Sequence, residues 1–162
     1  MNKQEIYSHL GSRKIHYEVT EHKAVYNMAE LEEVELPYPD ALAKNIFVRD
    51  DKKREYYLIT VKGNKLIDLK DFRKEHGTRR LTFADEHDMM EQLGLAPGSV
   101  TPLGLLNSKE CGVHFFLDKD FLTAPAIIGI HPNDNTATIW LPANDLISIL
   151  KEHGNEVQVI EI

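Results

Sequence analysis

Two apolar runs that meet at a charged stretch constrain the fold more than any other feature of the chain. Residues 45–50 (NIFVRD) and 55–61 (EYYLITV) are rich in β-branched and aromatic side chains, and DDKKR stands where they meet. Such runs around a short polar stretch are typical of two strands joined by a turn. We therefore expect a β-hairpin here, within a larger sheet.

The rest of the chain alternates further strand patterns with short helix patterns. Capping residues mark the helix starts: Asn27 with Glu30 three residues on, Asp68, Asp85, and either Asn144 or Asp145. This interleaving predicts an α+β fold: a mixed, mostly antiparallel, barrel-like sheet with helices packed outside it. The expected strands are 14–22, 81–84, 99–106, 112–122, 126–132, 136–142 and 156–162, and the expected helices are 27–36, 69–77, 86–94 and 146–154.

The length and composition fit one folded unit inside the cell. A chain of 162 residues has the usual size of a domain, so we expect residues 1–162 to form a single domain. The single cysteine, Cys111, can form no internal disulfide and belongs to no zinc pattern. The N-terminal segment lacks the apolar core of a secretory signal, and no apolar run reaches membrane-spanning length. We expect a cytoplasmic protein with no membrane partner and no metal.

Charge is distributed unevenly along the chain. The net charge is −7, which taken alone argues against a nucleic-acid partner. Residues 44–80, however, carry twelve basic and six acidic side chains, whereas the remainder carries seven basic and twenty acidic ones. A basic segment of this kind is either a solvated face or a local positive field that attracts a polyanion.

Lys44 and Asn45 stand directly before the apolar residues of the first hairpin strand. A lysine offers a compact charge suited to a phosphate, and an asparagine offers both a donor and an acceptor. The alternative is an edge-strand lysine that deters aggregation. The chain has no P-loop, no G-x-S-x-G and no H-E-x-x-H that would indicate a different chemistry.

Two other segments have the composition of a binding site. Gly98 and Gly104 flank a Ser-Val-Thr-Pro stretch, where the backbone could approach a ligand closely or simply form a loop. His131 follows an apolar strand pattern and precedes Pro132, so its ring is expected at the rim of the sheet, where either a ligand or the backbone could satisfy it.

Together, ALAKNIFVRD, GSVTPLG and AIIGIHPN resemble the editing-domain family that includes YbaK and the insertion domain of bacterial prolyl-tRNA synthetases. The resemblance covers essentially the whole chain, including VTEHKAVYNMAE. The AKN-x-F-x-x-D form, the length and the HGTRRLTFADE stretch are most similar to the free-standing alanyl-tRNA(Pro) deacylases, the ProXp-ala or PrdX type.

The resemblance implies hydrolysis of the aminoacyl ester at the 3′ adenosine of mischarged Ala-tRNA(Pro), with no protein nucleophile and no cofactor. A synthetase excludes a smaller amino acid poorly by binding alone, so a second sieve removes the wrong product. Lys44 would engage the terminal phosphate, and Asn45 would line the amino-acid pocket. His131 would shape that pocket, with Gly129 and Ile130 beside it. The G-x-x-x-P loop of Gly98, Ser99, Val100, Thr101 and Pro102 would hold the ester carbonyl or the attacking water through the backbone amides that it offers.

The resemblance also implies tRNA(Pro) as the partner, bound through its acceptor stem and aminoacylated 3′ end, with prolyl-tRNA synthetase as a second candidate and no DNA. Arginine can read a base edge as well as bind phosphate, so Arg80 is the first candidate contact and Arg79 its rival. The other candidates are Arg49, Lys52, Lys53 and Arg54.

Three alternatives remain open at the level of sequence. The same chemistry could act on Cys-tRNA(Pro) or on tRNAs that carry serine or threonine. The fold could serve as a non-catalytic module that docks on a tRNA or a synthetase. The chain could also be an α+β domain that binds a small carboxylate, with its basic segment merely solvated.

Overall fold

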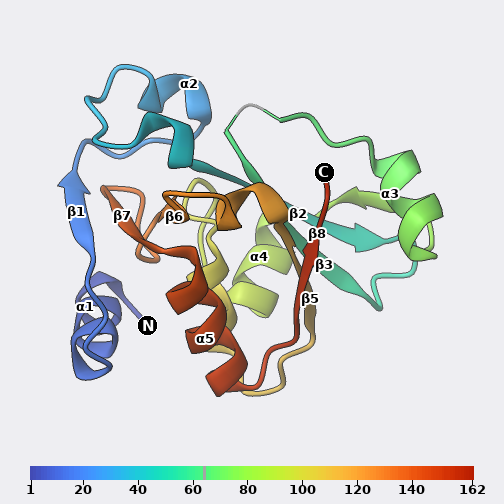
Figure 1. Cartoon of the computed structure of the whole chain (residues 1–162). Coiled ribbons are helices and arrows are strands. Elements are labelled where there is room, and N and C mark those ends of the chain that lie inside the picture. Colours follow the sequence, from blue (N-terminus) through green and yellow to red (C-terminus); the bar gives the residue numbers. More distant parts are fainter. Residues whose placement is uncertain (64) are drawn as a thin grey trace.

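The computed structural model describes residues 1–63 and 65–162, which form two sheets with helices around them (Figure 1). The five-stranded sheet has the order β4-β2-β3-β5-β8 and the three-stranded sheet the order β1-β7-β6. The strands are β1 (Glu18–Glu21), β2 (Ala43–Asp50), β3 (Tyr56–Lys62), β4 (Leu81–Phe83), β5 (Val113–Asp118), β6 (Ile127–Ile130), β7 (Ala137–Pro142) and β8 (Val157–Ile160).

The predicted hairpin is confirmed as β2 and β3, which pair antiparallel with Asn45 opposite Thr60. Asp50 shapes its turn, because Asp50 Oδ1 accepts hydrogen bonds from the backbone N–H groups of Lys52 (3.1 Å) and Arg54 (2.9 Å). An aspartate that bonds the backbone a few residues on is a common device for reversing a chain. The charged stretch is therefore a turn held by its own first aspartate.

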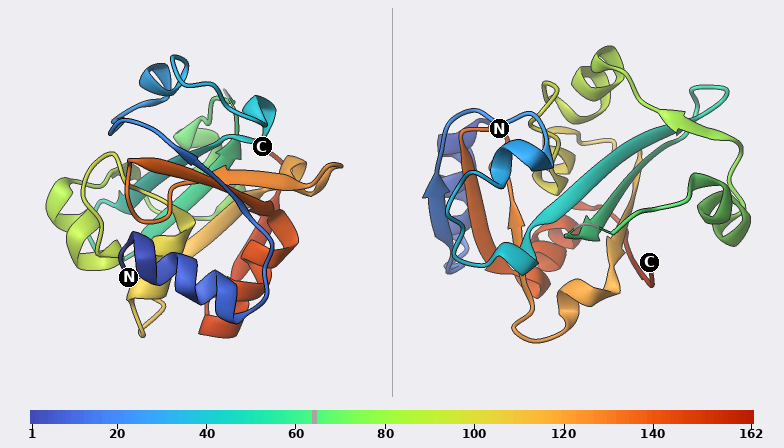
Figure 2. Two further views of the ribbon diagram at one scale, coloured as in Figure 1. Left: turned by 90° about the vertical axis from the view of Figure 1, so that its left-hand side faces the viewer. Right: turned by 90° about the horizontal axis from the view of Figure 1, so that it is seen from above.

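The α+β class and the mixed, mostly antiparallel pairing are confirmed. Four of the strand pairs are antiparallel, and the two on either side of β5 are parallel. Among residues 1–63 and 65–162 the two sheets do not close into a barrel, and one isolated parallel bridge, Leu42 to Gly129, joins the start of β2 to β6. Figure 2 shows the two sheets lying against each other with the hairpin extending away from the smaller one.

Two helix caps predicted from the sequence are found at the predicted aspartates, and the cap of the last helix differs. Asp68 and Asp85 cap α3 (Leu69–His76) and α4 (Glu86–Leu93), and each helix ends at a glycine with left-handed backbone, Gly77 and Gly94. α5 (Ala143–His153) begins one residue before the predicted Asn144, after Pro142 and without a side-chain cap. No described helix has the length and apolar character needed to cross a bilayer.

Four local predictions were wrong or incomplete. α1 (Lys3–Ser12) was missed, although Asn2 and Glu5 form a full capping box at its start. α2 is a single turn (Met28–Leu31), which ends well before the predicted end at residue 36. The strand expected at 99–106 is instead the 3₁₀ helix η2 (Pro102–Asn107), with Pro102 in its first turn. Two further 3₁₀ turns are η1 (Pro39–Ala41) and η3 (Lys119–Leu122), and η3 replaces the second part of the strand expected at 112–122, which ends at Asp118.

Proline explains the failure at η2. It supplies no N–H to a strand ladder, but its fixed φ suits the first turn of a helix. Thr101 completes that start, since its hydroxyl accepts from the backbone N–H of Leu103 at 3.4 Å. The apolar residues after Pro102 face the core from a helical turn rather than from a strand.

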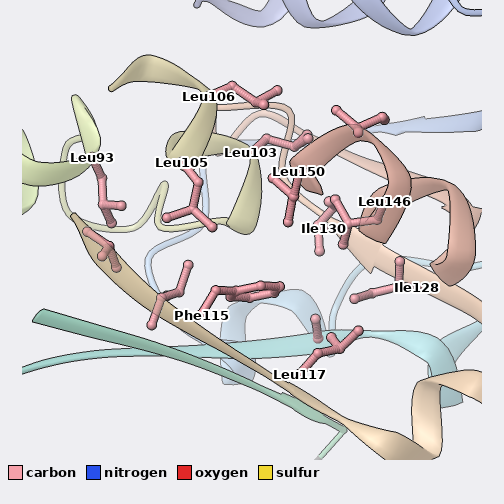
Figure 3. Close-up of a cluster of buried hydrophobic side chains, with 14 of the residues drawn as sticks. Leu93, Leu103, Leu105, Leu106, Phe115, Leu117, Ile128, Ile130, Leu146 and Leu150 are labelled. Atoms are coloured by element: carbon pink, nitrogen blue, oxygen red, sulfur yellow. The ribbon is translucent and has the colours of Figure 1, made fainter. Parts of the chain in front are cut away.

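The main core lies between the larger sheet, the smaller sheet and α5 (Figure 3). Phe115 and Leu117 of β5 and Leu146 and Leu150 of α5 are fully buried in it. The opposite face of the larger sheet packs against Phe72 of α3. A third cluster, built on Trp140 of β7, fixes the segment that carries α2 over the outer face of the smaller sheet. This last cluster holds the α2 segment beside the start of β2 and β6.

Candidate active site

A cavity of about 330 Å³ lies where the α2 segment, the start of β2, the end of β6 and the loop before η2 meet. Its size falls within the roughly 300–1,000 Å³ typical of small-molecule sites. The lining residues are Val25, Tyr26, Asn27, Met28, Leu31, Leu42, Ala43, Lys44, Asn45, Met89, Gly98, Val100, Gly129, Ile130, His131 and Thr138.

Most of the catalytic and pocket residues proposed from sequence meet in this one cavity. The structure brings together Lys44, Asn45, Gly98, Val100, Gly129, Ile130 and His131. Ser99, Thr101 and Pro102 are buried and do not line it. Thr101 caps η2 and Pro102 lies in its first turn, so these two residues form the end of the loop. The catalytic and binding roles of all these residues stay predictions.

Lys44 and Asn45 differ in how they are held. Lys44 is half-buried and forms no ion pair with any residue in the described part of the chain. Asn45 Oδ1 accepts a hydrogen bond of 2.6 Å from the buried Thr60 hydroxyl. The bond leaves the NH₂ group of Asn45 as the part of its amide available to a ligand. The cavity therefore has an uncompensated cation beside an oriented donor.

Gly98 brings its backbone to the edge of the cavity in a conformation that favours glycine. Its φ is +84°, and a Cβ there would lie 2.8 Å from Cδ1 of Tyr26 and 3.2 Å from the backbone oxygen of Val25. Any larger residue would be strained and would collide with the α2 segment. The backbone of Gly98 thus lies close to Tyr26, while the predicted close approach to a ligand stays a prediction.

The His131 ring is hydrogen-bonded to the backbone and also lines the cavity; contact with a ligand stays a prediction. Its Nδ1 lies 2.8 Å from the carbonyl oxygen of Ala137. The carbonyl can only accept, so Nδ1 carries the hydrogen and Nε2 of the neutral ring is left as an acceptor. Burial, with a further contribution from nearby His22, lowers the pKa of His131 below its usual value. The ring is thus kept neutral near physiological pH.

Gly129 and Ile130 face opposite sides of β6. A Cβ at position 129 would lie 2.2 Å from Cζ3 of Trp140, so only glycine leaves room for the indole. Ile130 is almost fully buried and its side chain lies among the core residues near Leu146 (Figure 3). Ile130 therefore supports the cavity wall chiefly from the core.

The basic residues proposed for tRNA contact have unequal freedom. Arg79 Nε and Nη2 bind the two carboxylate oxygens of Asp51, at 2.7 and 3.0 Å. Arg49 is only 20% exposed at its side chain, and its Nε lies 3.4 Å from Oδ2 of buried Asp88. That pairing makes Arg49 a link between β2 and α4 rather than an open surface cation. Arg80, Lys52, Lys53 and Arg54 are exposed.

Sequence reasoning missed part of the cavity wall. Tyr26 and Met28 lie in the VTEHKAVYNMAE segment, to which the resemblance assigned no site role, and Thr138 lies in β7. His22 had no assigned role, yet its ring centroid is 6.0 Å from that of His131, and its Nε2 lies 3.0 Å from the Thr138 hydroxyl. No local pattern marks these residues, because only the packing of α2 on the smaller sheet brings them together.

The chemistry available in the cavity is one of charge and hydrogen bonding. It offers the Lys44 ammonium, the Asn45 amide and the His131 acceptor, and its described lining includes no serine or cysteine. Thr138 is fully buried, with its hydroxyl against His22. Among residues 1–63 and 65–162, no group of three or more His, Cys, Asp or Glu side chains is arranged to hold a metal ion. Such a site suits positioning and electrostatic stabilisation of a bound ester.

Comparison with known proteins defines the class. The family described as "Aminoacyl-tRNA editing domain" matches residues 22–149. The chain is 37% identical over 160 residues to the prolyl-tRNA editing protein ProX of Acetoanaerobium sticklandii, covering 99% of this chain and 97% of that protein. It is 35% identical over 155 residues to the prolyl-tRNA synthetase associated domain-containing protein 1 of Mus musculus, covering 94% and 91%.

A solved structure has the same fold. It is described as a proposed trans-editing enzyme for prolyl tRNA synthetase and superposes with a TM-score of 0.70 at 22% identity, covering 99% of this chain and 96% of that one. The class defined by fold and cavity is an aminoacyl-tRNA deacylase. The chain belongs to the aminoacyl-tRNA editing domain family, which confirms the predicted membership.

Proposed function

We propose that this protein is a trans-editing hydrolase that removes alanine from mischarged Ala-tRNA(Pro). The observation that carries the proposal is the meeting of Lys44, Asn45, the Gly98 loop and His131 around one cavity. The relatives named as prolyl-tRNA editing and prolyl-tRNA synthetase associated proteins support tRNA(Pro) as the substrate.

Each group has a distinct task in the proposed mechanism. The Lys44 ammonium binds the terminal phosphate and places the ester in the cavity. The Asn45 NH₂, oriented by Thr60, donates to an oxygen of the aminoacyl group. Backbone amides near Gly98 and Val100 stabilise the charge that develops on the carbonyl oxygen.

The reaction needs no protein nucleophile. A water oxygen bonds to the ester carbonyl carbon, the bond from that carbon to the ribose oxygen breaks, and the ribose oxygen takes a proton. The neighbouring ribose hydroxyl or backbone groups orient the water. Holding the ester and the water in reacting geometry can lower the activation barrier by about 7–11 kcal/mol.

Selectivity for alanine is assigned to the apolar and histidine walls of the cavity. Met28, Leu31 and Val100 line it together with His131. Binding discriminates about 1–3 kcal/mol per methylene, and a rigid wall that rejects proline adds a steric penalty. The sieve thus removes the smaller amino acid and spares the correct product.

The acceptor stem is assigned to the far end of the hairpin. β2 runs from Lys44 at the cavity to Asp50 at the turn, which is about 20 Å at 3.3 Å per residue. The register of β4 on β2 pairs Leu81 with Asp50, so Arg80 lies beside the basic turn. A tRNA with its 3′ end in the cavity would extend along this strand toward the basic residues. In this proposal the chain acts as one cytoplasmic domain, with prolyl-tRNA synthetase as a candidate partner.

A deacylation panel tests the function. The protein is incubated with Ala-, Ser-, Cys- and Pro-tRNA(Pro), and loss of the ester is followed over time. We expect hydrolysis of the alanyl species and survival of the prolyl one. Hydrolysis of the cysteinyl or seryl species in place of the alanyl one would assign a different substrate. Binding of tRNA with no hydrolysis of any species would identify a non-catalytic module.

A further inference from the structure

One aromatic side chain at the cavity is mostly exposed. Tyr26 lines the cavity, yet 65% of the residue is accessible. Its backbone N–H donates to Glu30 Oε2 at 2.7 Å, which ties it to the first turn of α2. A tyrosine used for packing is usually buried, as Tyr56 and Tyr57 are here. The exposed ring of Tyr26 thus has an anchored backbone and an open surface.

The ring is also supported from one side. A Cβ at Gly98 would lie 2.8 Å from Tyr26 Cδ1, so the ring rests directly against the glycine backbone. The neighbouring carbonyl of Val25 accepts from Asn135 Nδ2 at 2.8 Å, which ties the segment to the turn between β6 and β7. These contacts limit how far the ring can move and leave much of its surface to solvent.

We propose that Tyr26 is a stacking platform for the adenine base of the terminal nucleotide, an inference that rests on the proposed function. Nucleobases stack on exposed aromatic rings, and each stack contributes on the order of 1–3 kcal/mol. Lys44 lines the same cavity and supplies a cation for the phosphate of that nucleotide. The two residues hold the base and the phosphate, and the ester enters the cavity between them.

A second exposed aromatic provides a matched control. Phe83 on β4 is 70% accessible and does not line the cavity. Removal of its ring changes exposed aromatic area by a similar amount without touching the proposed platform. A loss of binding seen with Tyr26→Ala and not with Phe83→Ala is therefore due to the place of the Tyr26 ring at the cavity, and not to a general loss of exposed aromatic surface.

The first test is binding of adenosine 5′-monophosphate and ribose 5-phosphate, measured by calorimetry or NMR titration on the full chain. We expect wild type and Tyr26→Phe to prefer the adenine nucleotide. Tyr26→Ala should bind it about 5- to 150-fold more weakly, the cost of losing one stack. Phe83→Ala should match wild type. Equal binding of the two ligands by wild type, or unchanged nucleotide binding by Tyr26→Ala, would overturn the proposal, as would no binding of either ligand.

The second test separates this inference from the function itself. On Ala-tRNA(Pro), Tyr26→Ala should lose kcat/KM by a similar factor while Tyr26→Phe stays near wild type. Thermal unfolding of each variant shows whether the fold is intact. If wild type hydrolyses no aminoacyl-tRNA, the proposed function fails, whatever the nucleotide titration gives. If wild type is active and Tyr26→Ala is equally active, only the stacking platform fails.

Discussion

Thr60 and Asn45 face each other across the β2–β3 hairpin, and the Thr60 hydroxyl donates a 2.6 Å hydrogen bond to Asn45 Oδ1. Thr60 is fully buried and does not line the cavity, so it reaches the site only through Asn45. The bond decides which end of the amide faces a ligand. Thr60 is therefore a positioning residue for the donor that Asn45 presents.

Replacement of Thr60 by valine keeps its shape and removes this bond. We expect kcat/KM for the alanyl ester to fall about fivefold, since loss of one such bond costs about 1 kcal/mol and frees the amide to rotate. Thr60→Ser retains the hydroxyl and should stay close to wild type. Steady-state deacylation with Asn45→Ala as reference measures this. Full activity of Thr60→Val beside a defective Asn45→Ala would contradict the assignment.

Lys44→Ala should abolish measurable deacylation, because it removes the cation assigned to the terminal phosphate. Loss of one preorganised electrostatic contact typically costs about 10²–10³ in rate. Lys62→Ala is the matched control: Lys62 lies opposite Ala43 on the same hairpin and does not line this cavity. Deacylation at the wild-type rate by Lys44→Ala would rule out the proposed mechanism.

Arg80 and Arg79 should differ in tRNA binding. Arg79 is already held by Asp51, whereas Arg80 is exposed and has no ion pair in the described part of the chain. Arg80→Ala should weaken binding and reduce the slope of log K against log salt by about 1 per lost phosphate contact. Arg79→Ala should change the slope less. Equal slopes for Arg80→Ala and wild type would remove Arg80 as a phosphate contact.

Gly98→Ala should destabilise the fold and the cavity together. The positive φ and the 2.8 Å approach to Tyr26 both oppose a Cβ. We expect a loss of about 1–3 kcal/mol in the free energy of unfolding, measured by denaturant titration. Gly112→Ala serves as control, because a Cβ there meets nothing within 4 Å. A neutral Gly98→Ala would mean that the loop relaxes freely.

The neutral state of His131 predicts a pH dependence of stability. In the unfolded chain the ring titrates near its ordinary pKa of about 6.5, and burial lowers the folded pKa below that value. Between the two pKa values the unfolded chain binds a proton that the folded chain does not. Stability is therefore complete above the ordinary pKa and falls as the pH drops toward the folded one.

Comparison of wild type with His131→Asn isolates this contribution from the other histidines. Denaturation measures the free energy of unfolding of both proteins. The value for wild type, relative to that for His131→Asn, should fall as the pH is lowered from about 7.5 to 5.5. A difference that does not change with pH would show that His131 titrates normally in the folded state.

The local structure that sequence predicted well has short-range causes. The hairpin follows from the composition of β2 and β3, and α3 and α4 follow from the aspartates and glycines at their ends. The same reasoning failed at η2, because an apolar run does not distinguish a strand from a 3₁₀ turn unless Pro102 is given full weight. α1 shows the converse, a capping box present in the sequence and overlooked.

The residues of the candidate site also fall into two groups: those that the sequence indicated and those that only the fold brings to the cavity. Lys44, Asn45, Gly98 and His131 could be identified from the sequence through a family resemblance, and family membership is confirmed. Tyr26 and His22 lie in a segment that the resemblance covers, but neither they nor Thr138 received a role, because no spacing relates the α2 segment to the smaller sheet. Arg49 and Arg80 look alike in sequence, yet only Arg49 is drawn into an ion pair with buried Asp88.

Taken alone, the sequence determined the chemical groups and the local elements that carry them, since capping, turn formation and strand composition act over a few residues. Only the tertiary structure decided which of these groups share a cavity. The Leu42–Gly129 bridge and the cluster around Trp140 bring the start of β2, the end of β6 and the α2 segment together. The bridge joins residues almost ninety positions apart, and the cluster joins residues still farther apart, so their stability comes from burial that no local pattern encodes.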